Sequence, residues 1–201
     1  ARTATSLRLD ANFVVSNNLF LVGRGAYVKN SFTLKPKGQS GLQTYRDVSG
    51  VFHNNYQDFE TERPATTLMA DGNYFRGRHE VKFGFSSRRF KVDSTLVWPG
   101  GALNIHDAES YADTGAMLSI LFRPFESHTD GHYLGAYIGD TITWDRLTVN
   151  LALRWDRQST SSLETVIQGN ELVPDVLAGF TAPPLDNAIT FNTPGPRLGF
   201  T

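Results

Sequence analysis

The chain has 201 residues, enough for a single domain, and no cysteine, which excludes disulfide bonds and thiolate metal sites. Its 19 basic and 20 acidic side chains give a formal charge of −1, and this balance argues against a general nucleic-acid-binding protein. No segment has the roughly 18 consecutive apolar residues that a membrane-spanning helix requires, although the alternating strands of a membrane β-barrel escape that criterion.

In chain order, six segments have the apolar–polar alternation with a period of two that is typical of β-strands. They are residues 3–15, 19–30, 64–75, 79–92, 131–143 and 147–159. The six segments form three pairs, because only a short link separates the members of each pair, as a tight hairpin requires. The last segment alternates most regularly, with apolar side chains at every odd position from Leu147 to Trp155.

Three long segments, residues 31–63, 93–130 and 160–194, follow the pairs and are rich in turn-forming residues. A compact soluble domain rarely carries three such loops, whereas outer-membrane barrels alternate short periplasmic turns with long extracellular loops. A strand of about 13 residues, tilted by about 40°, covers roughly 33 Å, which is enough to cross a hydrocarbon core. The sequence therefore predicts an all-β fold, an antiparallel up-and-down meander that forms part of a large transmembrane β-barrel.

Four segments carry a resemblance to known strand motifs. Residues 137–144, YIGDTITW, are similar to a YVQDTW motif, and residues 146–156, RLTVNLALRWD, resemble the RLTLNLGLRYD strand that follows it. Residues 79–89, HEVKFGFSSRR, resemble HELKFGFEYRR, and residues 196–201, PRLGFT, resemble PRLGFAYD, the start of another strand. These motifs, in this order, resemble the barrel of TonB-dependent outer-membrane transporters of the Oar-like kind.

The resemblance implies energised uptake across the outer membrane of a Gram-negative-type bacterium, through a barrel of about 22 strands that a plug fills. Residues 1–201 are expected to hold about six full strands and the start of a seventh, with no plug and no signal peptide, so the chain is expected to be a fragment. The implied partners are outer-membrane lipid, the plug and remaining strands of the full-length protein, and indirectly the TonB system. Nucleic acid is not an expected partner.

The polar faces of the strands supply the candidate functional residues, because side chains opposite the apolar faces would point into the lumen. They would contact the plug or a passing substrate, or only brace the wall. The candidates are Arg8, Asp10, Asn12, Glu80, Lys82, Arg88, Asn150, Arg154 and Asp156.

No catalytic, cofactor-binding or metal-binding residue is predicted, and the chain is not expected to be an enzyme. The histidines form no His-Glu-x-x-His pattern, and the acidic residues Asp107, Glu109 and Asp113 form no calcium-loop pattern. No serine has the Gly-x-Ser-x-Gly setting of a nucleophile elbow.

Three alternatives stay open. A passive porin or structural barrel would be excluded by a plug encoded upstream. A protease or lipase on a barrel would need a Ser/His/Asp set at the rim. A soluble β-rich binding module would partition into buffer rather than detergent.

Overall fold

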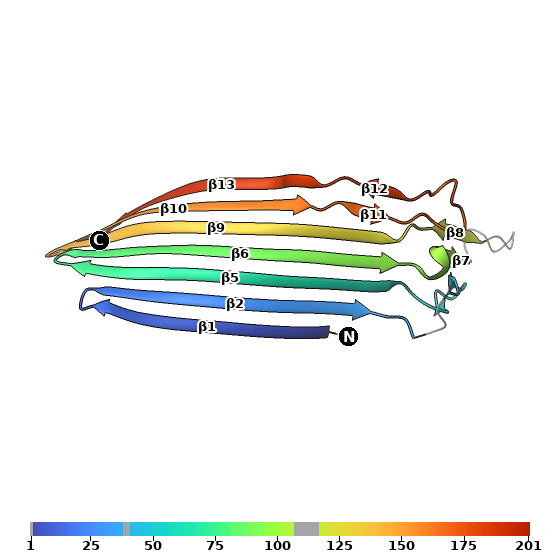
Figure 1. Cartoon of the computed structure of the whole chain (residues 1–201), viewed down its shortest axis with the longest axis horizontal. Helices are drawn as coiled ribbons and strands as arrows, with labels where there is room; N and C mark the ends of the chain where they lie inside the picture. The colour runs from blue at the N-terminus through green and yellow to red at the C-terminus, as the bar shows by residue number, and fades with distance from the viewer. Residues whose placement is uncertain (1, 38–40, 107–116) are drawn as a thin grey trace.

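The computed structural model describes residues 2–37, 41–106 and 117–201, and its main feature is one long antiparallel sheet (Figure 1). The seven strands follow one another in chain order across this sheet. They are β1 (Arg2–Ser16), β2 (Leu19–Leu34), β5 (Asp58–Arg76), β6 (His79–Val97), β9 (Phe125–Trp144), β10 (Leu147–Ser162) and β13 (Leu185–Phe200). The predicted all-β antiparallel meander is thereby confirmed. Within the described ranges, no helix is long and apolar enough to cross a membrane.

Short turns join the strands at one end of the sheet, on the left in Figure 1. Two residues separate β5 from β6 and two separate β9 from β10. Gly77 and Asp145 have positive φ angles of 59° and 48°, the backbone twist that tight hairpins need. The three predicted hairpins are therefore confirmed.

The last long strand begins earlier than the sequence predicted. Residues 185–194 were assigned to a loop because they contain aspartate, asparagine and proline, but they belong to β13 and pair with β10. The backbone groups along this edge of β10 pair with β13 from Val149 to Thr160, and this pairing outweighs the turn-forming composition. Pro194 and Pro196 are tolerated because β13 is the outermost strand of this sheet, where an N–H on the free side is not required.

The long segments 31–63, 93–130 and 160–194 were predicted to be loops, but their ends belong to the long strands, and their described interiors contain further short strands. They carry β3 (Thr44–Arg46), β4 (Phe52–His53), β7 (Ala102–Ile105), β8 (Leu118–Leu121), β11 (Thr165–Ile167) and β12 (Phe180–Ala182), and the 3₁₀ turn η1 (Pro99–Gly101). β3 and β7 pair in parallel, so the loop after β2 and the loop after β6 share one four-stranded sheet, β4-β3-β7-β8. The three loops between the long strands, in their described residues 35–37, 41–57, 98–106, 117–124 and 163–184, are called the loop cap, and they lie at the right of Figure 1.

The strand register divides the side chains between the two faces of the long sheet, because cross-strand partners point to the same side. One row of partners runs from Arg8 through Ala26, Thr67 and Arg88 to Tyr133. By the same register, all nine polar residues singled out in the sequence share this face, which we call the polar face.

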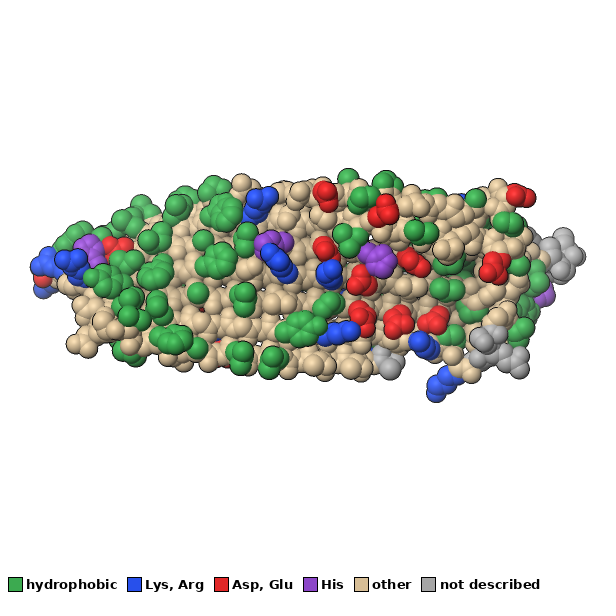
Figure 2. Space-filling view, in the orientation of Figure 1, with side chains coloured by type: hydrophobic (Ala, Val, Ile, Leu, Met, Phe, Trp, Pro, Cys, Tyr) green, Lys and Arg blue, Asp and Glu red, His purple; other side chains and the backbone are tan. Residues whose placement is uncertain are grey.

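The opposite face, called the apolar face below, carries large hydrophobic side chains that the described residues leave exposed. Leu68, Ile138 and Leu153 are 56%, 55% and 53% exposed. Figure 2 shows hydrophobic side chains gathered over the turn-side half of the sheet and charged ones over the loop-side half. A contiguous apolar surface of this extent marks contact with a membrane or a partner.

Three glycines of the sheet make room for an aromatic ring from the neighbouring strand. Cβ atoms built on Gly72, Gly84 and Gly131 would lie 2.3, 2.4 and 2.1 Å from the rings of Phe83, Tyr137 and Phe90, respectively. Each ring belongs to the direct cross-strand partner of its glycine. Covering a glycine with an aromatic ring fills the gap left by the missing side chain and helps to fix the register.

Candidate functional site

A chain of opposite charges crosses the polar face from β1 to β5. Arg8 Nε donates a hydrogen bond to Asp10 Oδ2 at 2.8 Å. Arg24 on β2 lies between two carboxylates, with Nε 3.6 Å from Asp10 Oδ1 and one terminal nitrogen 3.4 Å from Asp71 Oδ2. Each of these pairs is partly exposed, so a single pair adds little stability, and the alternation matters more as a charge pattern.

The charge pattern continues on β9 and β10 through two tyrosines. The Tyr137 hydroxyl donates to Asp71 Oδ1 at 3.0 Å. Arg154 donates to Asp156 Oδ2 at 2.7 Å and to the Tyr133 hydroxyl at 2.8 Å, and that hydroxyl donates to Asp156. These contacts orient the side chains in two clusters, one from Arg8 to Tyr137 and one formed by Tyr133, Arg154 and Asp156. We call the eight residues the polar band: Arg8, Asp10, Arg24, Asp71, Tyr133, Tyr137, Arg154 and Asp156.

Four of the nine sequence candidates, Arg8, Asp10, Arg154 and Asp156, belong to the polar band, and the others lie elsewhere on the same face. Closer to the turns, Lys82 Nζ pairs with Glu80 at 2.9 Å, and the Asn150 side chain accepts a hydrogen bond from Thr141 at 2.8 Å. Asn12 lies beside Val22 on β2, and Arg88 on the loop side has its guanidinium 5.9 Å from the centre of the Phe90 ring.

Sequence reasoning missed four members of the polar band: Arg24, Asp71, Tyr133 and Tyr137. Asp71 and Tyr137 lie in predicted strands, at positions that alternate with the apolar ones. Because successive side chains of a strand point to opposite faces, the alternation alone places both residues on the polar face. Arg24 lies between Gly23 and Gly25, and these two glycines weakened the alternation that would have assigned it.

The loop cap contains a hollow of about 580 Å³ between its three segments, lined among others by Gln43, Trp98, Phe122 and Leu172. The rings of Trp98 and Phe122 stack at 4.8 Å between centroids, with an interplanar angle of 15°. Tyr56 meets the Trp98 ring edge to face at 5.3 Å. These aromatic contacts give the cap a small apolar centre of its own.

Asn170, only 2% exposed, fastens the third loop to the second. Its side-chain nitrogen donates to the carbonyl oxygens of Gly101 and Phe122, both at 2.7 Å, and its side-chain oxygen accepts from the Leu172 N–H at 2.8 Å. A substitution here would remove both of these donors, and the Gly101 carbonyl oxygen would keep only the Phe122 N–H, at 3.0 Å.

We expect Asn170→Ala to open the loop cap while leaving the long sheet folded. Losing the hydrogen bonds of a buried side chain weakens a local structure by about 1–3 kcal/mol, which corresponds to roughly 5- to 150-fold faster amide exchange. Hydrogen exchange should accelerate in β7 and β11 but not in β5 and β6. The exposed neighbour Glu171→Ala is the control, and equal exchange in both variants would contradict the role given to Asn170.

A second local group of hydrogen bonds stabilises the turn between β3 and β4. The side-chain hydrogen bond with His53, at 2.6 Å, lowers the pKa of Asp47 below its usual value, and backbone hydrogen bonds from Val51 and Ser49 act in the same direction. Because folding lowers the pKa of Asp47, its ionised carboxylate stabilises the folded state fully at pH values above the pKa that Asp47 has in the unfolded chain. This stabilisation is lost as the pH falls through the pKa that Asp47 has in the folded state.

A metal or catalytic role finds no support in the described part of the chain. No group of three or more histidine and acidic side chains in the described ranges is placed to hold a metal ion. Asp107, Glu109 and Asp113 lie outside the described residues.

An antiparallel meander with strands of 15 to 20 residues, one apolar face, one polar face and long loops at one end has the features of a membrane β-barrel wall. The family model described as TonB dependent receptor-like, beta-barrel matches residues 2–200. The chain belongs to this family, which confirms the family resemblance read from its strand motifs. The family comprises outer-membrane receptors, which agrees with the prediction that the chain is not an enzyme.

One solved structure that the chain matches is the ferric-catecholate import receptor Fiu from Escherichia coli K12, in its closed form. The sequences are 13% identical and the TM-score is 0.44. The match covers 99% of this chain and 30% of the length of that receptor. No curated protein sequence matches the chain significantly.

Proposed function

We propose that the chain is part of the barrel wall of an outer-membrane receptor that imports its substrate with energy delivered by TonB. The observation that carries this proposal is the two-faced sheet, with the polar band on one side and an uncovered apolar surface on the other, in a chain of the TonB-dependent receptor family. The apolar face contacts lipid, and the polar face borders the lumen.

The polar band then faces the plug domain of the full-length protein. Its alternating charges form one side of a wet, charged interface that can release and rebind a plug, whereas an apolar interface would hold it permanently. The nine residues predicted from sequence line the lumen in this arrangement. The loop cap lies outside the cell, where loops held by a rigid scaffold form the usual recognition surface.

Single cysteines at adjacent positions test the assignment of the faces, since the chain has no cysteine of its own. In the full-length protein in outer membranes, Thr67→Cys on the polar face should cross-link to the plug. Leu68→Cys, its neighbour on the apolar face, should react only with a lipid-dissolved maleimide. Reaction of both with a water-soluble reagent would exclude a lipid-facing apolar surface.

Conductance separates energised import from passive diffusion. In a planar bilayer, the purified full-length protein should be closed until the plug is displaced by urea, because the lumen is filled. A steady open channel without urea would identify a passive porin instead, and uptake that is independent of TonB would reject energised transport.

A further inference from the structure

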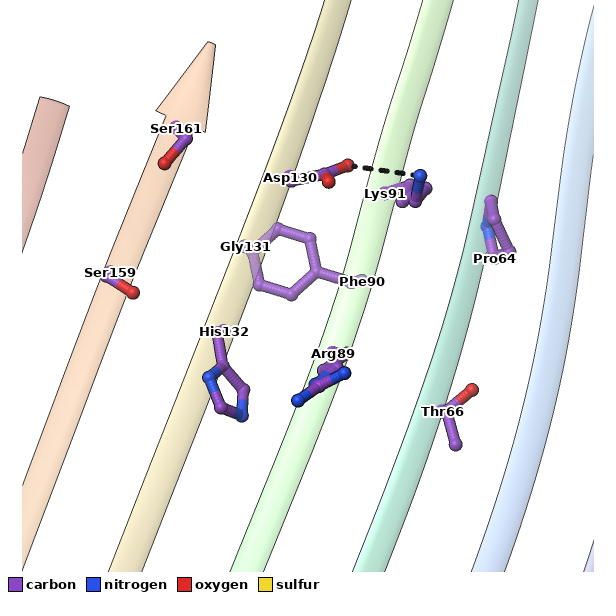
Figure 3. A pocket seen from close by; sticks show the side chains of 10 residues that line it. All are labelled: Pro64, Thr66, Arg89, Phe90, Lys91, Asp130, Gly131, His132, Ser159 and Ser161. Atoms are coloured by element: carbon purple, nitrogen blue, oxygen red, sulfur yellow. Dashed lines mark ion pairs between the residues drawn. The ribbon is translucent and has the colours of Figure 1, made fainter. Parts of the chain in front are cut away.

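Two arginines on the apolar face lie where its hydrophobic half ends. Arg89 on β6 is the cross-strand partner of His132 on β9, and His132 is in turn the partner of Ser159 on β10. Arg157 lies two residues before Ser159 on the same face, and both arginines are exposed. Figure 3 shows Arg89, His132 and Ser159 on neighbouring strands. These three residues line an open hollow of about 580 Å³, and Arg157 lies outside this lining.

The height of these residues along the strands matches a membrane boundary. Ten residues separate Arg89 from His79 at the turn end of β6. Ten residues span roughly 33 Å along a strand and, with a tilt of about 40°, about 25 Å across the bilayer, the height of the apolar band of such barrels. Between these two levels the face carries Phe83 and Phe85, and beyond Arg89 it carries mostly charged side chains.

The two arginines differ from the lysines around them because, among the described residues, they have no acidic partner. Lys91 pairs with Asp130 at 3.7 Å, the contact drawn in Figure 3, and Lys29 pairs with Glu62 at 2.9 Å. In the described parts of the chain, no carboxylate lies within 4.0 Å of the guanidinium of Arg89 or Arg157. Since Lys91 balances Asp130, the charge of the arginines stays uncompensated.

The arrangement points to one chemistry. Guanidinium groups bind phosphate oxygens in pairs of parallel hydrogen bonds, and the Ser159 and Thr66 hydroxyls beside the hollow can donate further ones. Strands β6 and β10 are two strand spacings apart, roughly 10 Å, and Arg157 is level with Ser87, two residues or roughly 7 Å along β6 from Arg89. The backbones at Arg89 and Arg157 are therefore roughly 12 Å apart, and the two long side chains can reach one group between them. The site opens sideways at the membrane boundary, where the phosphates belong to lipids.

We propose that Arg89 and Arg157 bind a phosphate group carried by a lipid of the outer leaflet. This inference rests on the proposed function, because only a barrel wall with the loop cap outside the cell places these residues in that leaflet. The site lies on the opposite face from the polar band and does not take part in substrate passage.

Lipid retention by the full-length protein in detergent tests this site. Bisphosphorylated lipid A should be retained about tenfold better than the same lipid without its phosphates, as expected for charge-assisted hydrogen bonds. The double variant Arg89→Gln/Arg157→Gln should lose this preference. The control Arg76→Gln/Arg78→Gln removes the same charge at the turn end of the strands and should keep it.

Different outcomes would contradict different parts of the proposal. A double variant at Arg89 and Arg157 that still prefers the phosphorylated lipid would overturn the site. Competition by inorganic phosphate at the same concentration as lipid A would overturn the lipid as ligand. If the protein retained no lipid with any headgroup, the proposed function as a barrel wall would be contradicted. Equal retention of both lipids would instead contradict only the phosphate site.

Discussion

Replacing Leu153 by arginine should lower the free energy of unfolding of the barrel by about 2–4 kcal/mol, the penalty for a guanidinium on the lipid face near the bilayer midplane. Leu153 is 53% exposed on the apolar face, and its cross-strand partner Ile138 is also apolar. Leu151 is a less informative position, since its partner Asp140 could pair with the introduced charge.

The matched control is Asn150→Arg, three residues earlier on β10 and on the polar face, where the new side chain would enter water. Its effect should be much smaller than that of Leu153→Arg. Both variants are measured as urea-induced unfolding of the full-length protein in lipid vesicles. Equal losses would contradict the assignment of the two faces, and a larger loss for Asn150→Arg would reverse it.

Gly84→Val should destabilise the barrel by about 1–3 kcal/mol, the usual penalty for added volume in a packed site. A Cβ atom at Gly84 would lie 2.4 Å from the Tyr137 ring and 2.6 Å from Asp71 Oδ1. The ring must therefore move, and its hydrogen bond to Asp71 is lost with it. The change also interrupts the polar band at its centre.

Gly23→Val is the control for this substitution, because a Cβ atom at Gly23 has nothing within 4 Å. Valine also suits an extended backbone better than glycine does, so this variant should be neutral or slightly stabilising. Unfolding in lipid vesicles again gives the comparison. If the two valine variants were equally stable, the close packing of Tyr137 over Gly84 would be refuted.

The long sheet could be predicted from sequence because its order is local. Strict alternation in β10 shows where the strand lies and which side chains share a face. The two-residue turns at Gly77 and Asp145 show which strands pair in antiparallel fashion, and each of these signals lies within a few consecutive residues. The polar band was partly accessible for the same reason: once the apolar parity of a strand is known, its polar side chains are assigned as well.

The loop cap could not be predicted in the same way, because its contacts join distant parts of the chain. Thr44 on β3 pairs with Leu103 on β7, and Asn170 bonds to Gly101 and Phe122. Strands of two to four residues carry too few side chains for a periodic pattern to be visible. The first ten residues of β13 were missed because their turn-forming composition is outweighed by pairing with β10.

The parallel pairing of β3 with β7 limits how the outer surface of such a receptor can be exchanged. A loop that folds on its own can be transplanted between proteins or replaced by recombination without regard to its neighbours. Here the segment between β2 and β5 completes its sheet only with a strand from the segment between β6 and β9. The two segments therefore form one structural unit and must be exchanged together, because a chimaera that takes only one of them would receive half of a sheet.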